Sequence, residues 1–70
     1  MNKSLLRSKM ALHSDTLRTL SAFLGMTYST LSEKINGRAE FSQSQIMMIK
    51  ERYSLTPVEI DDIFFTNEVS

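Results

Sequence analysis

Apolar residues recur three and four positions apart along the chain, and no run of alternating apolar and polar residues is long enough to suggest a strand. This spacing places apolar side chains on one face of a helix. It predicts five helices, at about residues 3–12, 16–24, 28–36, 43–53 and 57–65. Five helices in 70 residues, without repeats or low-complexity stretches, predict a single compact all-α domain over residues 1–70.

Three of these helices carry clear start signals. Thr27, Ser42 and Thr56 suit N-caps, because a side-chain oxygen can satisfy backbone N–H groups that the first turn leaves unpaired. Gln45 follows Ser42 by three residues and Glu59 follows Thr56 by three, so both starts are predicted capping boxes. Apolar residues before each cap and at the fourth helical position form three hydrophobic staples: Met26 with Leu31, Phe41 with Ile46, and Leu55 with Ile60.

The second and third helices are separated by a very short hinge, Leu24-Gly25-Met26-Thr27. Gly25 suits the end of one helix and Thr27 suits the start of the next. Two helices joined so tightly must cross steeply, as they do in a helix-turn-helix, here about residues 15–38. In that motif the second helix enters the major groove of DNA.

Composition excludes several kinds of site. There is no cysteine, so no disulfide framework or thiolate metal site is possible, and His13 alone cannot form a zinc site. We therefore expect no metal and no cofactor. No run approaches the roughly 18 apolar residues of a membrane span, and the first residues do not resemble a secretory signal. The sequence predicts a cytoplasmic protein without a membrane partner.

The net charge is zero, but the charges are unevenly distributed. Residues 1–40 hold six basic and three acidic residues, whereas residues 41–70 hold two basic and five acidic ones. A basic half can face polyanionic DNA while an acidic half repels it. Ordinary scatter of sixteen charges explains the same distribution equally well.

The third helix has a polar face beside the stripe formed by Leu31 and Ile35. Its side chains are short or hydrogen-bonding, which suits the donors and acceptors of base edges. A hydroxyl such as that of Ser29 can approach most bases, and a carboxylate such as that of Glu33 can accept from cytosine N4. We predict base contacts by Tyr28, Ser29, Ser32 and Glu33. The alternative is a solvated helix face.

Residues flanking this helix are candidates for phosphate contacts, which set the register of a protein on DNA and supply much of its affinity. The predicted residues are Thr16 and Arg18 at the preceding helix, the Thr27 cap, and Lys34, Asn36 and Arg38. Lys34 lies further round the helix, so it either contacts phosphate or is solvated. The capped helix start adds backbone N–H groups that suit a phosphate.

The run from Leu20 to Arg38 resembles the lambda-repressor-like helix-turn-helix family of phage repressors, Cro proteins and xenobiotic-response-element regulators. Residues 30–38, Thr-Leu-Ser-Glu-Lys-Ile-Asn-Gly-Arg, and the later Leu-Thr-Pro-Val-Glu-Ile run resemble especially short Cro-like regulators of Gram-positive phages and prophages. The resemblance implies a five-helix domain that binds operator DNA as a two-fold dimer. It places Tyr28, Ser29 and Glu33 where the family reads bases, and Thr16, Asn36 and Arg38 where it holds phosphates.

Two positions depart from the family pattern. Ser21 stands where a small alanine is usual, and it should be tolerated if its hydroxyl bonds back to the backbone. Lys34 stands where many members bury an aliphatic residue, with Ile35 one place later. This shift predicts a slightly rotated reading helix.

Two functions follow from these features. The first is a sequence-specific transcriptional regulator without enzymatic activity, which binds double-stranded operator DNA as a homodimer on a near-palindromic site and takes no small-molecule substrate. No nucleophile–base pair or phosphate-cradling glycine loop is present in the sequence, and His13 has no evident partner.

The second function is a protein-interaction module, antirepressor-like or antitoxin-like, that keeps the same fold. The zero net charge and Glu33 favour it. Phe65, Val69 and the acidic last helix would then form a dimer or docking face. The alternative for Phe65 is a place in the core.

Overall fold

The computed structural model describes residues 1–65, which form five helices and no strand. The helices are α1 (Lys3–Leu12), α2 (Leu17–Leu24), α3 (Tyr28–Ile35), α4 (Gln43–Tyr53) and α5 (Pro57–Phe64). All five predicted helices are present, each with bounds within one residue of the prediction. α2 starts one residue late because Thr16 has an extended backbone and acts as the cap.

Every helix begins at a side-chain cap, in the order Asn2, Thr16, Thr27, Ser42 and Thr56. Each cap accepts a hydrogen bond from the backbone N–H three residues further on. The two predicted capping boxes, at Ser42 and Thr56, are confirmed. A third box at Thr16 was not predicted, because Thr19 takes the place that Glu or Gln usually fills.

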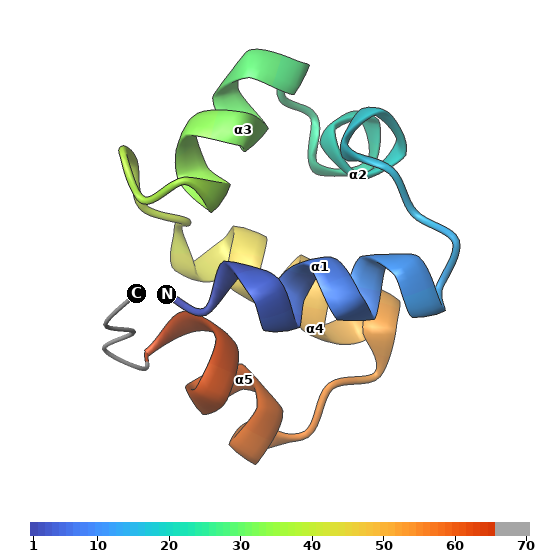
Figure 1. Ribbon diagram of the computed structural model, residues 1–70, viewed down its shortest axis with the longest axis vertical. Coiled ribbons are helices and arrows are strands. Elements are labelled where there is room, and N and C mark those ends of the chain that lie inside the picture. Colours follow the sequence, from blue (N-terminus) through green and yellow to red (C-terminus); the bar gives the residue numbers. More distant parts are fainter. Residues whose placement is uncertain (66–70) are drawn as a thin grey trace.

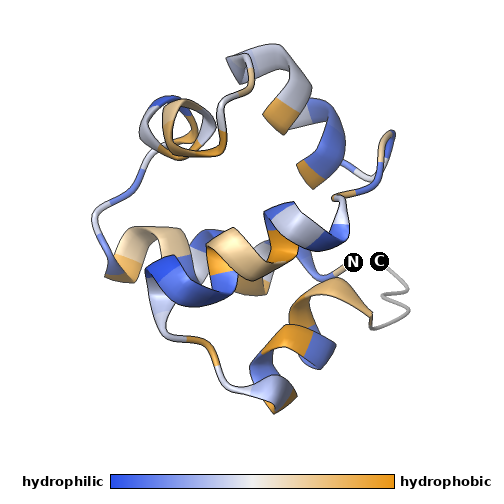
Figure 2. Cartoon of the chain, turned by 180° about the vertical axis from the view of Figure 1, so that it is seen from behind, coloured by the Kyte–Doolittle hydropathy of each residue, from blue (hydrophilic) through white to orange (hydrophobic). Residues whose placement is uncertain are grey.

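All five helices contribute to one core. Its fully buried side chains are Leu6, Leu20, Leu31, Ile35, Ile49 and Ile63, and Met10, Leu24, Tyr53 and Leu55 complete it. In Figure 2 each helix carries bands of hydrophobic and hydrophilic residues, as expected for helices that pack on one side only. The predicted all-α domain is therefore confirmed.

α2 and α3 lie over α1 and α4, with α5 on the far side (Figure 1). In this view α2 is seen nearly end-on, whereas α3 lies roughly in the plane of the picture. The axes of the two helices therefore cross steeply. They also share the most extensive contact between any two helices of residues 1–65. The N-terminus joins the end of α5, where the Asn2 N–H donates to the Ile63 carbonyl at 2.7 Å.

The two aromatic residues at the end of α5 differ in burial. Phe65 is 65% exposed, so of its two alternatives the place in the core is wrong. Phe64 is half-buried and packs edge-on against Phe41 with ring centroids 5.5 Å apart. The ring of His13, for which the sequence indicated no partner, stacks on Tyr53 at 4.9 Å. Val69 lies outside the described residues.

Candidate nucleic-acid interface

The turn between α2 and α3 consists of Gly25, Met26 and Thr27. Gly25 has a φ of 71°, in the left-handed region that glycine adopts without a steric penalty. The N–H groups of Gly25 and Met26 donate to the last carbonyls of α2, at 3.2 and 3.0 Å. Thr27 is extended and caps α3 at once, so the chain reverses within three residues.

Ser21 lies in this region and is 4% exposed. Its Oγ donates to the Arg18 carbonyl of the same helix at 2.9 Å. The expectation that its hydroxyl bonds back to the backbone is therefore confirmed. Because this bond satisfies the buried hydroxyl, serine is tolerated at this position.

α3 buries Leu31 and Ile35 and turns its polar side chains outward. Of the residues predicted to contact bases, Tyr28, Ser29 and Glu33 are exposed. Ser32 is half-buried, and its Oγ lies 3.4 Å from Asn36 Nδ2. The structure thus brings three of the four onto an open surface and leaves Ser32 at its edge.

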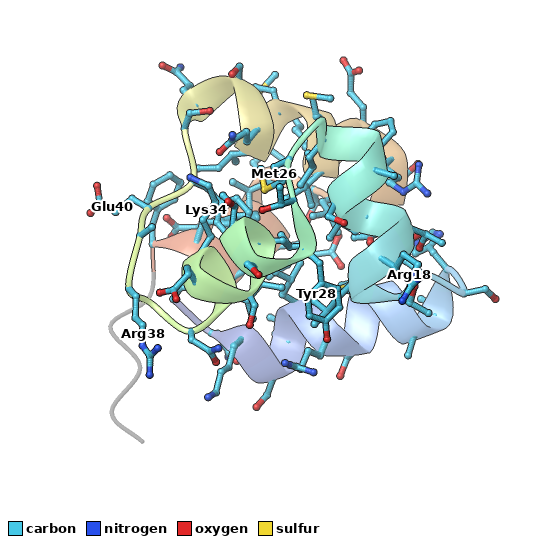
Figure 3. The ribbon with its side chains drawn as sticks, turned by 90° about the horizontal axis from the view of Figure 1, so that it is seen from above. Arg18, Met26, Tyr28, Lys34, Arg38 and Glu40 are labelled. Carbon is cyan, nitrogen blue, oxygen red and sulfur yellow. The ribbon has the colours of Figure 1, made fainter. Side chains whose placement is uncertain are left out.

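Five of the six residues predicted to contact phosphate are exposed, at helix starts or at and just beyond the end of α3: Thr16, Arg18, Thr27, Asn36 and Arg38. In Figure 3 Arg18 and Arg38 lie at opposite ends of the layer formed by α2 and α3, with Tyr28 between them. Arg38 Nη1 lies 3.8 Å from Glu33 Oε1. Both of these side chains are at least half exposed, so this ion pair is weak.

Lys34 points to the other side of α3, toward Glu40 (Figure 3). Its Nζ donates to the Glu40 carbonyl at 2.7 Å and lies 5.9 Å from the centroid of the Phe41 ring. The ammonium group therefore fastens the loop after α3. A phosphate contact by Lys34 requires this hydrogen bond to break.

A charged network that the sequence did not indicate surrounds Asp15, the residue before the Thr16 cap. Its side chain is 4% exposed. The carboxylate accepts from Arg52 Nε at 2.7 Å, Arg52 Nη2 at 2.9 Å, the Tyr53 hydroxyl at 2.6 Å and the Thr19 hydroxyl at 2.7 Å. The hydrogen bonds from Arg52 hold the pKa of Asp15 well below its usual range. Burial, with the bond to Asp15, raises the pKa of Tyr53.

Two ion pairs join the basic half of the chain to its acidic half. Asp15 pairs with Arg52, and Lys9 pairs with Glu59. The hydrogen bond from Lys9 lowers the pKa of Glu59. Within residues 1–65, the basic side chains without a described ion pair are Lys3, Arg7, Arg18, Lys34 and Lys50. All but Lys50 come from the half predicted to face DNA.

A hollow of about 320 Å³ lies beside the loop that Lys34 fastens. Its apolar lining comes mainly from Met1, Phe41, Ile46, Phe64 and Phe65. No group of side chains within residues 1–65 could hold a metal ion, and no helix in that range is long and apolar enough to cross a membrane.

Comparison of the chain with family models, curated proteins and solved structures finds no match.

Proposed function

We propose that this protein is a sequence-specific DNA-binding transcriptional regulator that places α3 in the major groove. The observation that carries the proposal is the exposed polar face of α3, held steeply across α2 by the Gly25 turn and flanked by Arg18 and Arg38. A short helix presented this way fits the width of the groove, and basic residues on both sides fit the two phosphate backbones. The sequence resemblance to lambda-repressor-like regulators supports the same function.

Base reading falls to three side chains. The Ser29 hydroxyl both donates and accepts, and the Tyr28 ring edge suits a thymine methyl. Glu33 accepts from the amino group of cytosine. A carboxylate near phosphates is repelled, and the neighbouring Arg38 offsets that repulsion.

Besides Arg38, beyond the end of α3, the starts of α2 and α3 supply the phosphate contacts. The caps at Thr16 and Thr27 satisfy the third N–H of each helix and leave the first two N–H groups without an intrahelical partner. These groups and the helix dipole favour an anion, and Arg18 adds a full positive charge to the first of the two sites.

A helix of eight residues reads only a few base pairs. Two copies on a near-palindromic operator, with half-sites about one helical turn apart, would provide the specificity that one copy lacks. We therefore propose a homodimer on DNA.

The proposal is tested by fluorescence anisotropy with labelled duplexes from the DNA that flanks the gene, at two salt concentrations. Wild-type protein should bind one region specifically and release it as salt rises. Replacing Ser29→Ala and Arg38→Ala together should weaken binding at least about tenfold, because one base contact and one phosphate contact are lost.

The matched control is Ser8→Ala with Lys50→Ala, which removes one hydroxyl and one positive charge from α1 and α4. It should bind within about threefold of wild type, since a lost charge away from the interface acts only at long range. Absence of salt-dependent binding to any duplex by the wild-type protein would sink the proposal.

A second function, a protein-interaction module, is favoured by one observation. Phe65 is exposed beside an apolar hollow, and such patches often mark contacts with other proteins. The same double variant separates the two functions. Full biological activity of Ser29→Ala with Arg38→Ala would support the interaction module.

A further inference from the structure

A network at the end of α4 contacts α2 at two points, just before its start at Asp15 and near its end at Phe23. Arg52 donates twice to Asp15, and its guanidinium also lies 4.4 Å from the centroid of the Phe23 ring. Tyr53, which is buried in the core, donates to the same carboxylate. A bidentate pair fixes orientation as well as distance, so Arg52 holds both ends of α2 in one geometry.

This network reaches the residues proposed to hold phosphate. The Thr19 hydroxyl donates to Asp15 and accepts from the Thr16 backbone N–H at 2.9 Å. The Thr19 N–H in turn donates to Thr16 Oγ1 at 3.2 Å. The Thr16 hydroxyl also lies 3.4 Å from Thr19 Oγ1, to which it can donate. The network therefore fixes the exposed Thr16 side chain at the start of α2, and Arg18 follows in the first turn.

The backbone on each side of the network is held in a disfavoured conformation. Ser14, just before Asp15, has a φ of 59°, and Ser54, just after Tyr53, has a φ of 52°. These are the two non-glycine residues with positive φ in residues 1–65. Side chains other than glycine, asparagine and aspartate rarely adopt this region, so contacts around it must stabilise it.

We infer that Asp15 is a positioning residue for DNA binding, which acts through Thr19 to place the Thr16 hydroxyl and Arg18 against a phosphate. The inference rests on the proposed function and goes beyond it, because it assigns a role in binding to a buried residue that cannot touch DNA. A purely structural Asp15 would affect only how much protein is folded. A positioning residue also changes how the folded protein binds.

The test compares wild type with Asp15→Asn, using a labelled duplex from the DNA flanking the gene. Binding is measured at 10 °C across a salt series, with circular dichroism to establish that both proteins are folded. We expect the slope of log affinity against log salt to fall by about one, which corresponds to about fivefold weaker binding at 0.15 M salt.

Charge alone predicts the opposite result. Asp15→Asn removes a negative charge, so without a positioning role it should bind DNA equally well or more tightly. Glu51→Gln is the control, since it makes the same charge change at an exposed position next to Arg52. It should keep the wild-type slope.

Tyr53→Phe is the second variant, because it removes one of the four hydrogen bonds to Asp15 and keeps the buried ring. It tests the inference even if Asp15→Asn does not fold at 10 °C, and it should weaken binding about two- to threefold. Wild-type slope and affinity in every folded variant would overturn the positioning role and leave DNA binding intact. A wild-type protein that binds no duplex would instead overturn the proposed function itself.

Discussion

The two ends of the α2–α3 pair are held in opposite ways. At the start of α2 the Asp15 carboxylate is 4% exposed and accepts four hydrogen bonds. At the end of α3 Glu33 and Arg38 are at least half exposed and 3.8 Å apart. Water screens the second pair strongly and the first pair less, because the Asp15 carboxylate is buried although Arg52 is 31% exposed.

This difference suggests two roles: the buried Asp15 network fixes the start of α2, whereas the exposed Glu33–Arg38 pair is free to contact a ligand. A buried carboxylate with four hydrogen bonds orients its neighbours, and removing it leaves the buried Tyr53 hydroxyl without its acceptor. An exposed pair loses little when its members change partners. In the proposed complex Glu33 and Arg38 would exchange each other for DNA groups, whereas Asp15 and Arg52 would hold the start of α2 in place.

The largest expected effect comes from removing the Asp15 carboxylate at the start of α2. Asp15→Asn should lower the free energy of unfolding by about 2 kcal/mol, because the buried Tyr53 hydroxyl and the partly exposed Arg52 lose a charged acceptor. For a domain of this size, that corresponds to a fall of roughly 10 °C in Tm. Urea unfolding and thermal melts followed by circular dichroism measure both.

Glu51→Gln again serves as the comparison, and it should change the free energy of unfolding by less than about 0.5 kcal/mol. If the two variants lost equal stability, the buried network would be no stronger than an exposed charge.

The next effect is a dependence on pH. Because the folded pKa of Asp15 is depressed, its stabilisation is present above the unfolded pKa of about 3.9 and is lost as pH falls below that value. The stability difference between wild type and Asp15→Asn should therefore be largest near neutral pH and should narrow below about pH 4. Urea unfolding at pH 7, 5, 4 and 3 measures this difference.

Glu59, whose pKa is also depressed, is identical in both proteins, so the subtraction removes its contribution. A difference that stayed constant down to pH 3 would show that Asp15 is not the group that titrates.

The contrast between the two ends also marks where sequence reasoning succeeded. Caps and staples are local patterns, and those at Thr27, Ser42 and Thr56 predicted helix starts to the residue. The amphipathic spacing predicted that Leu31 and Ile35 would be buried. The polar face of α3 could be named from sequence for the same reason.

The Asp15 network could not be predicted this way, because 37 residues separate Asp15 from Arg52. The sequence shows an aspartate before a cap and an arginine near a helix end, both common on surfaces. Only the packing of α4 against the start of α2 brings them together. The same holds for Lys34, whose partner is a backbone carbonyl that any residue at position 40 would supply.

A smaller effect is expected at the end of α3, where Lys34 holds the following loop. Lys34→Met keeps the apolar part of the side chain and removes the ammonium group, so it should lower the free energy of unfolding by about 0.5 to 1 kcal/mol. Its salt slope for DNA binding should match wild type, because the ammonium is bonded to the loop. A slope reduced by about one would place Lys34 on a phosphate instead.

The smallest effect should be a gain in stability at Ser14, just before the Asp15 network. Ser14→Gly removes the steric penalty of a φ of 59°, partly offset by the greater freedom of glycine in the unfolded chain, for a net gain of about 0.5 kcal/mol. Ser8→Gly, inside α1, should instead lose about 0.5 kcal/mol, the difference in helix propensity between serine and glycine. Chemical denaturation resolves both signs. If Ser14→Gly were destabilising, serine would suit this turn by itself; a gain would show that Ser14 is strained and that surrounding contacts hold it in this conformation.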